Sequence, residues 1–261
     1  YPSYKATDVA SCILLNPGRD VSLKVDVKND GVLKEVTIPA SYFGLEPYKR
    51  TYKALELTLE HPFDGTWGGN FSYVWSRSKG SAEGYVQSTL QQEDAGITQD
   101  FDFGSFSHGS SGYLPNDRTH VFKFFGNYAV AESFKVGATA IISSGRPKSC
   151  IGFVPKTVAD FNKVDGHSGS GDYTSASSYY CLDDNGKTQL TQRGAAGRTP
   201  WTGQLDLQFS FTPKTTHGRL TLQANVFNVL NSQKAVRLNE VRDFSRADTN
   251  AQWATPPAPG K

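Results

Sequence analysis

Apolar and polar residues alternate with a period of two along much of this chain, which predicts β-strands. Six segments show the alternation, each with one apolar and one hydrophilic face, because successive side chains of a strand point to opposite sides. Their apolar positions are, in chain order, Leu55, Leu57 and Leu59; Phe71, Tyr73 and Trp75; Phe122, Phe124 and Tyr128; Phe134, Val136, Ala138, Ala140 and Ile142; Leu205, Leu207, Phe209 and Phe211; Leu220, Leu222, Ala224 and Val226. Helical periodicity is scarce, so we expect an all-β fold of about six antiparallel strands.

The connections between these strands alternate between short and long. Short turns join the members of three expected strand pairs, at 48–79, 118–144 and 203–231. Long segments precede, separate and follow the pairs, at 1–47, 80–117, 145–202 and 232–261. Compact soluble domains rarely contain such long irregular loops, whereas membrane barrels carry short turns on one rim and long loops on the other. We therefore predict one partial domain of a large transmembrane β-barrel, with short periplasmic turns and long extracellular loops.

In such a barrel the two faces of each strand have different surroundings. The apolar face meets lipid, and the opposite face, with residues such as Glu56, Lys123 and Asp206, lines an aqueous lumen. Aromatic residues are expected near the membrane interfaces, at Trp67, Tyr73, Trp75 and Tyr128. The same alternation also fits a soluble β-sandwich whose apolar face is buried in a core, so a secreted adhesin or carbohydrate-binding module stays open as the alternative.

Composition excludes several other classes of protein. The 261 residues carry 27 Lys and Arg against 25 Asp and Glu, without a basic block, so we expect no nucleic-acid binding. Strictly apolar runs such as Cys12–Leu15 are far shorter than the about 20 residues of a membrane-spanning helix. The chain opens with Tyr1 and contains no Met, which favours a processed or partial chain.

Three cysteines occur, at positions 12, 150 and 181, without the paired spacing of a zinc site. Cys150 and Cys181 lie in one polar stretch rich in Gly and Ser, and in an exported protein a disulfide between them is the simplest interpretation. Free thiols are the alternative. If the disulfide forms, Cys12 is unpaired within this chain, which suggests a partner upstream of Tyr1.

No catalytic set is recognisable, so we expect a protein that is not an enzyme and has no metal centre. The segment from Asp26 to Thr37 is similar to a calcium-binding loop, but Lys28 occupies a ligand position and Thr37 replaces the closing Glu. Loop-bound Ca²⁺ is the one cofactor kept as an alternative to none. The acidic positions Asp94, Asp100 and Asp102 favour a solvated loop over a cation site.

Aromatic residues in the long loops are the candidates for ligand contact, because exposed loop aromatics often anchor ligands. The candidates are Tyr85, Phe106, Tyr113, Phe153, Tyr179, Tyr180 and Trp253. The alternative is that these side chains pack the loops against one another.

An ordered set of short motifs suggests a family. The motifs are Asn16–Gly18, Arg50–Glu56, Leu114–Lys123, Ser144–Pro147, Arg193–Gly194, Gly197–Trp201, Leu205–Asp206 and Asn225–Asn231. In this order and spacing the chain resembles the C-terminal barrel portion of TonB-dependent outer-membrane receptors, in particular the Oar-like subgroup, over nearly its whole length. It departs from that pattern where it stops at Pro256–Lys261 without a final strand, and it lacks a plug domain. We therefore expect a piece of a larger polypeptide.

The resemblance implies transport of a bulky ligand across the outer membrane of a Gram-negative bacterium. The implied partners are the plug and remaining barrel strands of the same receptor, the TonB–ExbB–ExbD complex that drives import, outer-membrane lipid and lipopolysaccharide, and an unknown ligand. Oar-like members have poorly defined ligands, so export or surface adhesion stays open as well.

Overall fold

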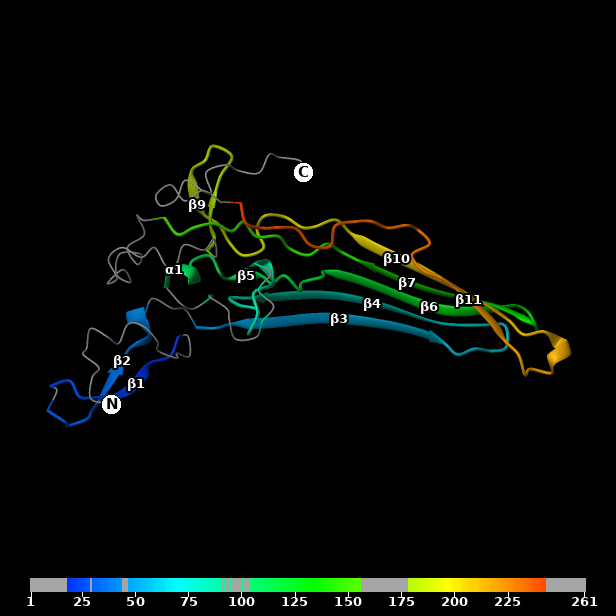
Figure 1. Ribbon diagram of the computed structural model, residues 1–261, viewed down its shortest axis with the longest axis horizontal. Helices are drawn as coiled ribbons and strands as arrows, with labels where there is room; N and C mark the ends of the chain where they lie inside the picture. The colour runs from blue at the N-terminus through cyan, green and yellow to red at the C-terminus, as the bar shows by residue number, and fades with distance from the viewer. Residues whose placement is uncertain are drawn as a thin grey trace.

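The computed structural model describes residues 18–28, 30–43, 47–90, 92, 94, 100, 104–155 and 178–242. Most of them build one antiparallel sheet in the strand order β11-β10-β7-β6-β4-β3 (Figure 1). Its strands are β3 (Arg50–His61), β4 (Trp67–Gly80), β6 (His120–Ala131), β7 (Phe134–Ser143), β10 (Thr202–Phe211) and the shorter β11 (Leu222–Val226). Among the described strands, the two-residue β5 (Gly112–Tyr113) pairs only with β4. The prediction of an all-β fold with about six antiparallel strands is confirmed.

The short connections lie together at one end of the sheet and the long ones at the other (Figure 1). Residues 62–66, 132–133 and 212–221 form the short ones. In the first, the Asp64 carboxylate accepts hydrogen bonds from the backbone N–H groups of Thr66 at 2.8 Å and Trp67 at 2.9 Å, as in an Asx turn. In the last, His217 follows the 3-10 helix η3 (Lys214–Thr216) with φ of 50°.

The long connections contain short elements that the sequence did not predict. They are the hairpin of β1 (Val21–Val25) and β2 (Lys34–Ile38), the 3-10 helices η1 (Ala40–Phe43) and η2 (Ser88–Leu90), the one-turn helix α1 (Gly104–Ser107), and the hairpin of β8 (Tyr180–Leu182) and β9 (Thr188–Leu190). Elements of three to five residues are too short to show a clear period. None of the helices in the described ranges is long and apolar enough to cross a membrane.

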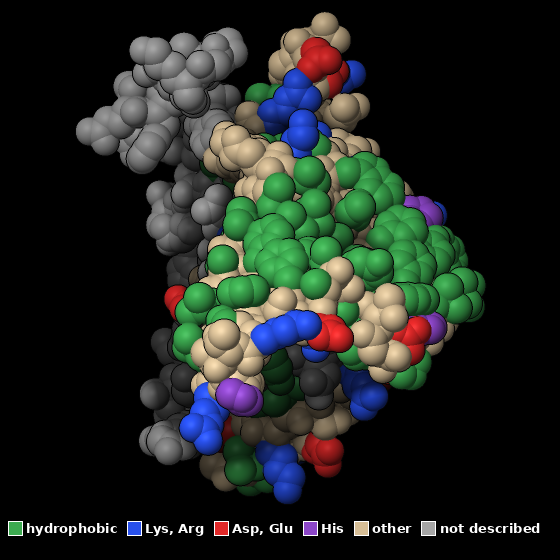
Figure 2. Space-filling view, turned by 90° about the vertical axis from the view of Figure 1, so that its right-hand side faces the viewer, with side chains coloured by type: hydrophobic (Ala, Val, Ile, Leu, Met, Phe, Trp, Pro, Cys, Tyr) green, Lys and Arg blue, Asp and Glu red, His purple; other side chains and the backbone are tan. Residues whose placement is uncertain are grey.

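One face of the sheet is apolar and uncovered. Its pairing register places Leu59, Phe71, Phe124, Ala140 and Leu205 in a single row across five strands. Leu59 is 70% exposed and Phe124 41%. Within the described part of the chain no second sheet or helix layer packs on this face. Seen from the end with the short turns, hydrophobic side chains form one broad area on the outer side of the sheet (Figure 2).

The opposite face is polar and hollowed. The next row along the strands contains Glu60, Asn70, Phe125, Thr139 and Asp206. These residues line a concavity of about 520 Å³ near the turn end of the sheet. Phe125, which is 57% exposed, is the one large apolar side chain in that row. The curvature therefore turns the polar face inward and the apolar face outward.

Candidate functional site

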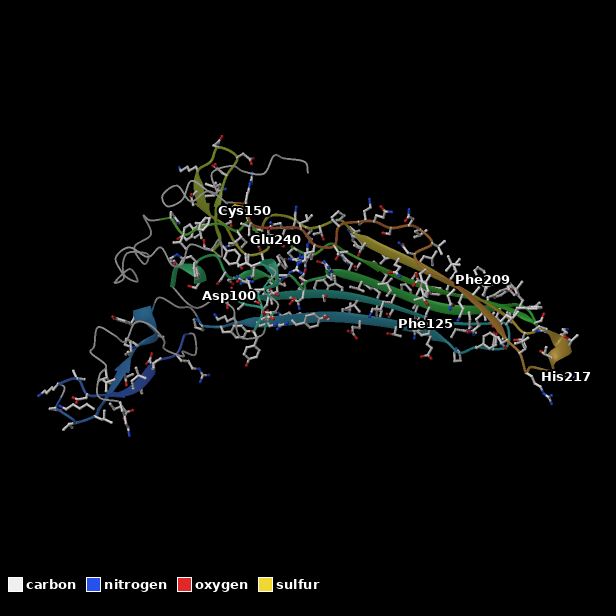
Figure 3. The ribbon with its side chains drawn as sticks, in the orientation of Figure 1. Asp100, Phe125, Cys150, Phe209, His217 and Glu240 are labelled. Atoms are coloured by element: carbon white, nitrogen blue, oxygen red, sulfur yellow. A yellow bond between two sulfur atoms is a disulfide. The ribbon has the colours of Figure 1, made fainter. Side chains whose placement is uncertain are left out.

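The buried core of the described residues lies in the long connections and not on the sheet. We call the described parts of 81–119, 144–201 and 227–242 the loop layer. All six buried hydrophobic residues belong to it, namely Ala82, Phe106, Leu114, Ile151, Tyr179 and Cys181. Asp100, Cys150 and Glu240 gather at this end, well away from Phe125 and Phe209 on the sheet (Figure 3). The loop layer is therefore a packed structure of its own.

Arg193 connects several segments of the loop layer through its buried side chain. Its side chain is fully buried, and its Nε donates a hydrogen bond to the Ser110 carbonyl oxygen at 2.7 Å. One terminal nitrogen donates to the Ser81 carbonyl at 3.0 Å and to Asp100 Oδ1 at 3.3 Å. Asp100 also accepts a hydrogen bond from Gln87 Nε2 at 2.9 Å. The Arg193 guanidinium, which belongs to segment 144–201, thus connects three residues of segment 81–119.

The electrostatic surroundings keep Arg193 charged. Its guanidinium lies 5.1 Å from the ring centroid of Tyr179, and Glu83 Oε1 lies 4.0 Å from its other terminal nitrogen. Desolvation by itself lowers the pKa of a buried guanidinium. The electrostatic influence of Tyr179, Asp100 and Glu83 outweighs this effect and raises the pKa of Arg193. Burial also raises the pKa of the Tyr179 hydroxyl, which stays neutral at physiological pH.

A second buried ion pair brings the C-terminal segment into the loop layer. Glu240 accepts hydrogen bonds from the Arg146 guanidinium at 2.5 Å and from the Ser149 backbone N–H at 2.6 Å. Burial raises the pKa of Glu240, and these two donors partly offset that rise. The Ile151 backbone N–H donates a hydrogen bond to the Glu240 carbonyl, and the Ile151 carbonyl accepts one from the Arg242 N–H, so that Ile151 forms a β-bridge with Val241. Segment 227–242 is therefore held against residues 146–151.

A third pair joins the loop layer to the sheet. Arg198 donates to Asp117 Oδ2 at 2.5 Å and to the Gly145 carbonyl at 2.9 Å. Asp117 is fully buried and accepts a hydrogen bond from the Ser78 backbone N–H of β4 at 2.6 Å. The close approach of this region leaves no room for a side chain at Gly145, where an added Cβ would lie 1.6 Å from the Thr199 carbonyl oxygen.

The disulfide expected from the sequence is present. Cys150 and Cys181 are bonded, with their Cα atoms 5.7 Å apart, 31 residues apart in the chain. The bond joins the segment after β7 to β8. Cys12, whose partner the sequence left open, lies outside the described residues.

The loop aromatics divide into buried and exposed groups. Phe106 is 3% exposed and Tyr179 is fully buried, so these two pack the loop layer and have no surface for ligand contact. Tyr85 is 77% exposed, whereas the other described candidates, Tyr113, Phe153 and Tyr180, are half-buried. Trp253 lies outside the described residues. Ligand contact by the four accessible aromatics stays a prediction.

The structure corrects one interpretation of the acidic residues. Asp100, expected in a solvated loop, is 3% exposed and pairs with Arg193. Asp94 is exposed, and Asp102 lies outside the described residues. The sequence did contain one signal of the buried ion pairs, which is an arginine next to a glycine at Arg146, Arg193 and Arg198. Glycine lets two backbones approach closely. The chain positions alone did not show which carboxylates these arginines meet.

No group of three or more metal-ligating side chains occurs among the described residues. At the segment similar to a calcium loop, the Asp26 carboxylate accepts hydrogen bonds from the backbone N–H groups of Asp30 at 3.1 Å and Gly31 at 2.6 Å. It thereby stabilises the turn between β1 and β2. Calcium binding there stays a prediction.

Part of the chain is similar in sequence to a known transporter. No protein-family model matches the chain. Over 189 residues, or 70% of its length, the chain is 29% identical to the TonB-dependent transporter Oar of Myxococcus xanthus. It is a partial homologue of a TonB-dependent transporter. The match spans 15% of that relative's length.

Among solved structures, the outer membrane transporter YddB from Escherichia coli is similar over 85% of this chain and 26% of that chain. The sequence identity is 13% and the TM-score is 0.40.

Replacing Arg193 with Met should loosen the loop layer. The substitution leaves the Asp100 carboxylate buried without its cation, which costs about 3–5 kcal/mol. Hydrogen exchange of residues 104–119 should become faster, while Lys187→Met, which removes an exposed charge from the turn between β8 and β9, should leave it unchanged. Equal exchange in both variants would show that Arg193 does not hold these segments together.

Removing the disulfide should also loosen the segment that it closes. For a loop of 31 residues, the chain-entropy model gives about 4 kcal/mol of stabilisation. The variant Cys150→Ser/Cys181→Ser should be cleaved faster by protease between the two positions than the parent protein, with Cys12→Ser as the matched control. Alkylation of Cys150 or Cys181 in the unreduced parent protein would contradict the bond.

Proposed function

We propose that this chain forms part of the barrel wall, with the attached loops, of a TonB-dependent transporter in the outer membrane of a Gram-negative bacterium. The observation that carries the proposal is the uncovered apolar face opposite a hollowed polar face.

Exposure of the apolar face is too extensive for a surface in water. Leu57 is 54% exposed, Leu59 70% and Leu222 55%, on strands at both edges and with aromatic side chains between them. Soluble monomers rarely expose contiguous apolar patches of more than a few hundred Å². In lipid the same side chains are favourably placed, and the polar face would line the lumen.

The spacing of aromatic residues fits the thickness of a bilayer. Trp67 and Trp75 lie on the same face of β4, eight positions apart, which corresponds to about 26 Å along a strand and to about 20 Å along the membrane normal when the strand tilts by about 40°. Barrel walls carry an apolar band about 25 Å tall between two aromatic girdles. Trp201 and Tyr128, each about half exposed, lie near the two ends of this band, because His120 stacks on Trp201 and Tyr128 pairs with Trp67.

The edges of the sheet call for further strands. Within the described residues, β3 and β11 each pair on one side only. Unpaired backbone groups in lipid cost several kcal/mol each, so a membrane wall must continue on both sides. The proposal therefore includes the remaining strands of the same receptor as partners. The similarity to a TonB-dependent transporter supports the further partners, which are the plug, the TonB–ExbB–ExbD complex and an unidentified bulky ligand.

The alternative, a secreted β-sandwich, requires a second sheet against the apolar face. The described residues contain no such sheet. Fractionation of cells that produce the polypeptide containing this chain separates the two functions. We expect recovery with outer membranes and a different gel mobility before and after heating. Recovery in the aqueous fraction with a single mobility would favour the sandwich.

A charge on the apolar face should prevent assembly of the barrel. Leu59→Arg places a cation near the middle of the proposed lipid-facing band, at a cost of about 2–4 kcal/mol. Thr58→Arg is the matched control, because Thr58 is adjacent to Leu59 in the chain but is exposed on the polar face. We expect loss of the heat-modifiable form in outer membranes for the first variant only. Equal tolerance of both arginines would contradict the assignment of the faces.

A further inference from the structure

Cations gather just beyond the aromatic residues at the loop end of the apolar face. Arg77 and Lys79 follow Trp75 on β4 by two and four positions, so they share its face of the sheet. Lys53 of β3 lies directly opposite Arg77, and Tyr113 of β5 lies directly opposite Lys79. We call Lys53, Arg77, Lys79 and Tyr113 the basic rim.

No carboxylate in the described part of the chain balances the positive charge of the basic rim. Like charges directly across an antiparallel pair, as at Lys53 and Arg77, are destabilising. Within the described residues no carboxylate lies within 4.0 Å of Lys53, Arg77 or Lys79. The nearby Arg198 adds a further cation 5.4 Å from the ring of Tyr113, although it is paired with Asp117. An anion between these side chains would relieve the repulsion.

Tyr113 holds the cations in place. The Lys79 Nζ lies 4.5 Å from its ring centroid and the Arg77 guanidinium carbon 5.4 Å. Arg77 also donates a hydrogen bond to the Tyr113 hydroxyl at 3.0 Å and lies 5.8 Å from the Trp75 ring. A guanidinium has five N–H donors, so one bond to Tyr113 leaves Arg77 able to bind an oxyanion with two parallel bonds.

We propose that the basic rim binds the phosphate groups of an anionic lipid in the outer membrane. The rim lies about 7 to 13 Å beyond Trp75 along β4, which is where headgroups adjoin the hydrocarbon. The lipid phosphate supplies the missing negative charge, and its acyl chains lie against the apolar rows below, from Leu55 and Trp75 onward. The inference rests on the proposed function, because only a lipid-facing sheet brings the rim to the headgroups.

The test compares lipid retention by two charge-matched variants of the full polypeptide. Arg77→Gln/Lys79→Gln removes two charges from the rim, and Lys123→Gln/Lys135→Gln removes two from the polar face. Each protein is purified from outer membranes, exchanged into neutral detergent with bisphosphorylated lipid A, and analysed by native mass spectrometry. We expect about thirtyfold weaker lipid binding for the rim variant, as two cations near an anionic lipid surface imply, and unchanged binding for the other.

Three outcomes would overturn the proposal. They are equal binding by the two variants, equal binding of lipid A from which the phosphates have been removed, and displacement of lipid A by inorganic phosphate at the same concentration. Heat-modifiable mobility verifies that each variant is folded. The single variant Lys79→Gln, at an exposed position, is milder and should also weaken the binding of lipid A. Absence of the parent protein from outer membranes would instead contradict the proposed function.

Discussion

The structure depends on one constraint, which is that none of the described residues packs against the outer face of its sheet. Leucine, phenylalanine and tryptophan side chains form continuous rows across the strands, and the described residues provide no layer that covers them. Burial of apolar area is the main favourable term in folding, so a sheet with an uncovered apolar face needs an apolar surrounding. The curvature, the aromatic spacing and the polar concavity are consistent with lipid on the outside and water within.

The loop layer, in contrast, buries its own core, which contains only six hydrophobic residues among those described. Its core of six hydrophobic residues is supplemented by buried ion pairs at Arg193, Arg146 and Arg198, and by one disulfide. Buried pairs contribute little net stability, but breaking one is costly. They therefore fix which loop lies against which, and they give long connections a defined surface above the proposed lumen.

The two regions meet at the loop end of the strands. There Asp117 accepts a hydrogen bond from β4 while it pairs with Arg198, and the basic rim lies on the outer side of the same strand. The sheet, the loops and the proposed headgroup level are thus linked through a few residues. A substitution at the loop end of the strands would affect both the position of the loops and the proposed contact with the membrane surface. A substitution at the turn end would affect neither.

The sequence by itself determined the six main strands, their antiparallel pairs and the two faces, because alternation with period two is a local property of the chain. It also indicated the disulfide, since two cysteines shared one loop. Only the tertiary structure decided which charges are paired. The contacts of Arg193 with Asp100, Arg146 with Glu240 and Arg198 with Asp117 span 93, 94 and 81 positions. Such partners are chosen by how the loops pack, and no local pattern of residues records that packing.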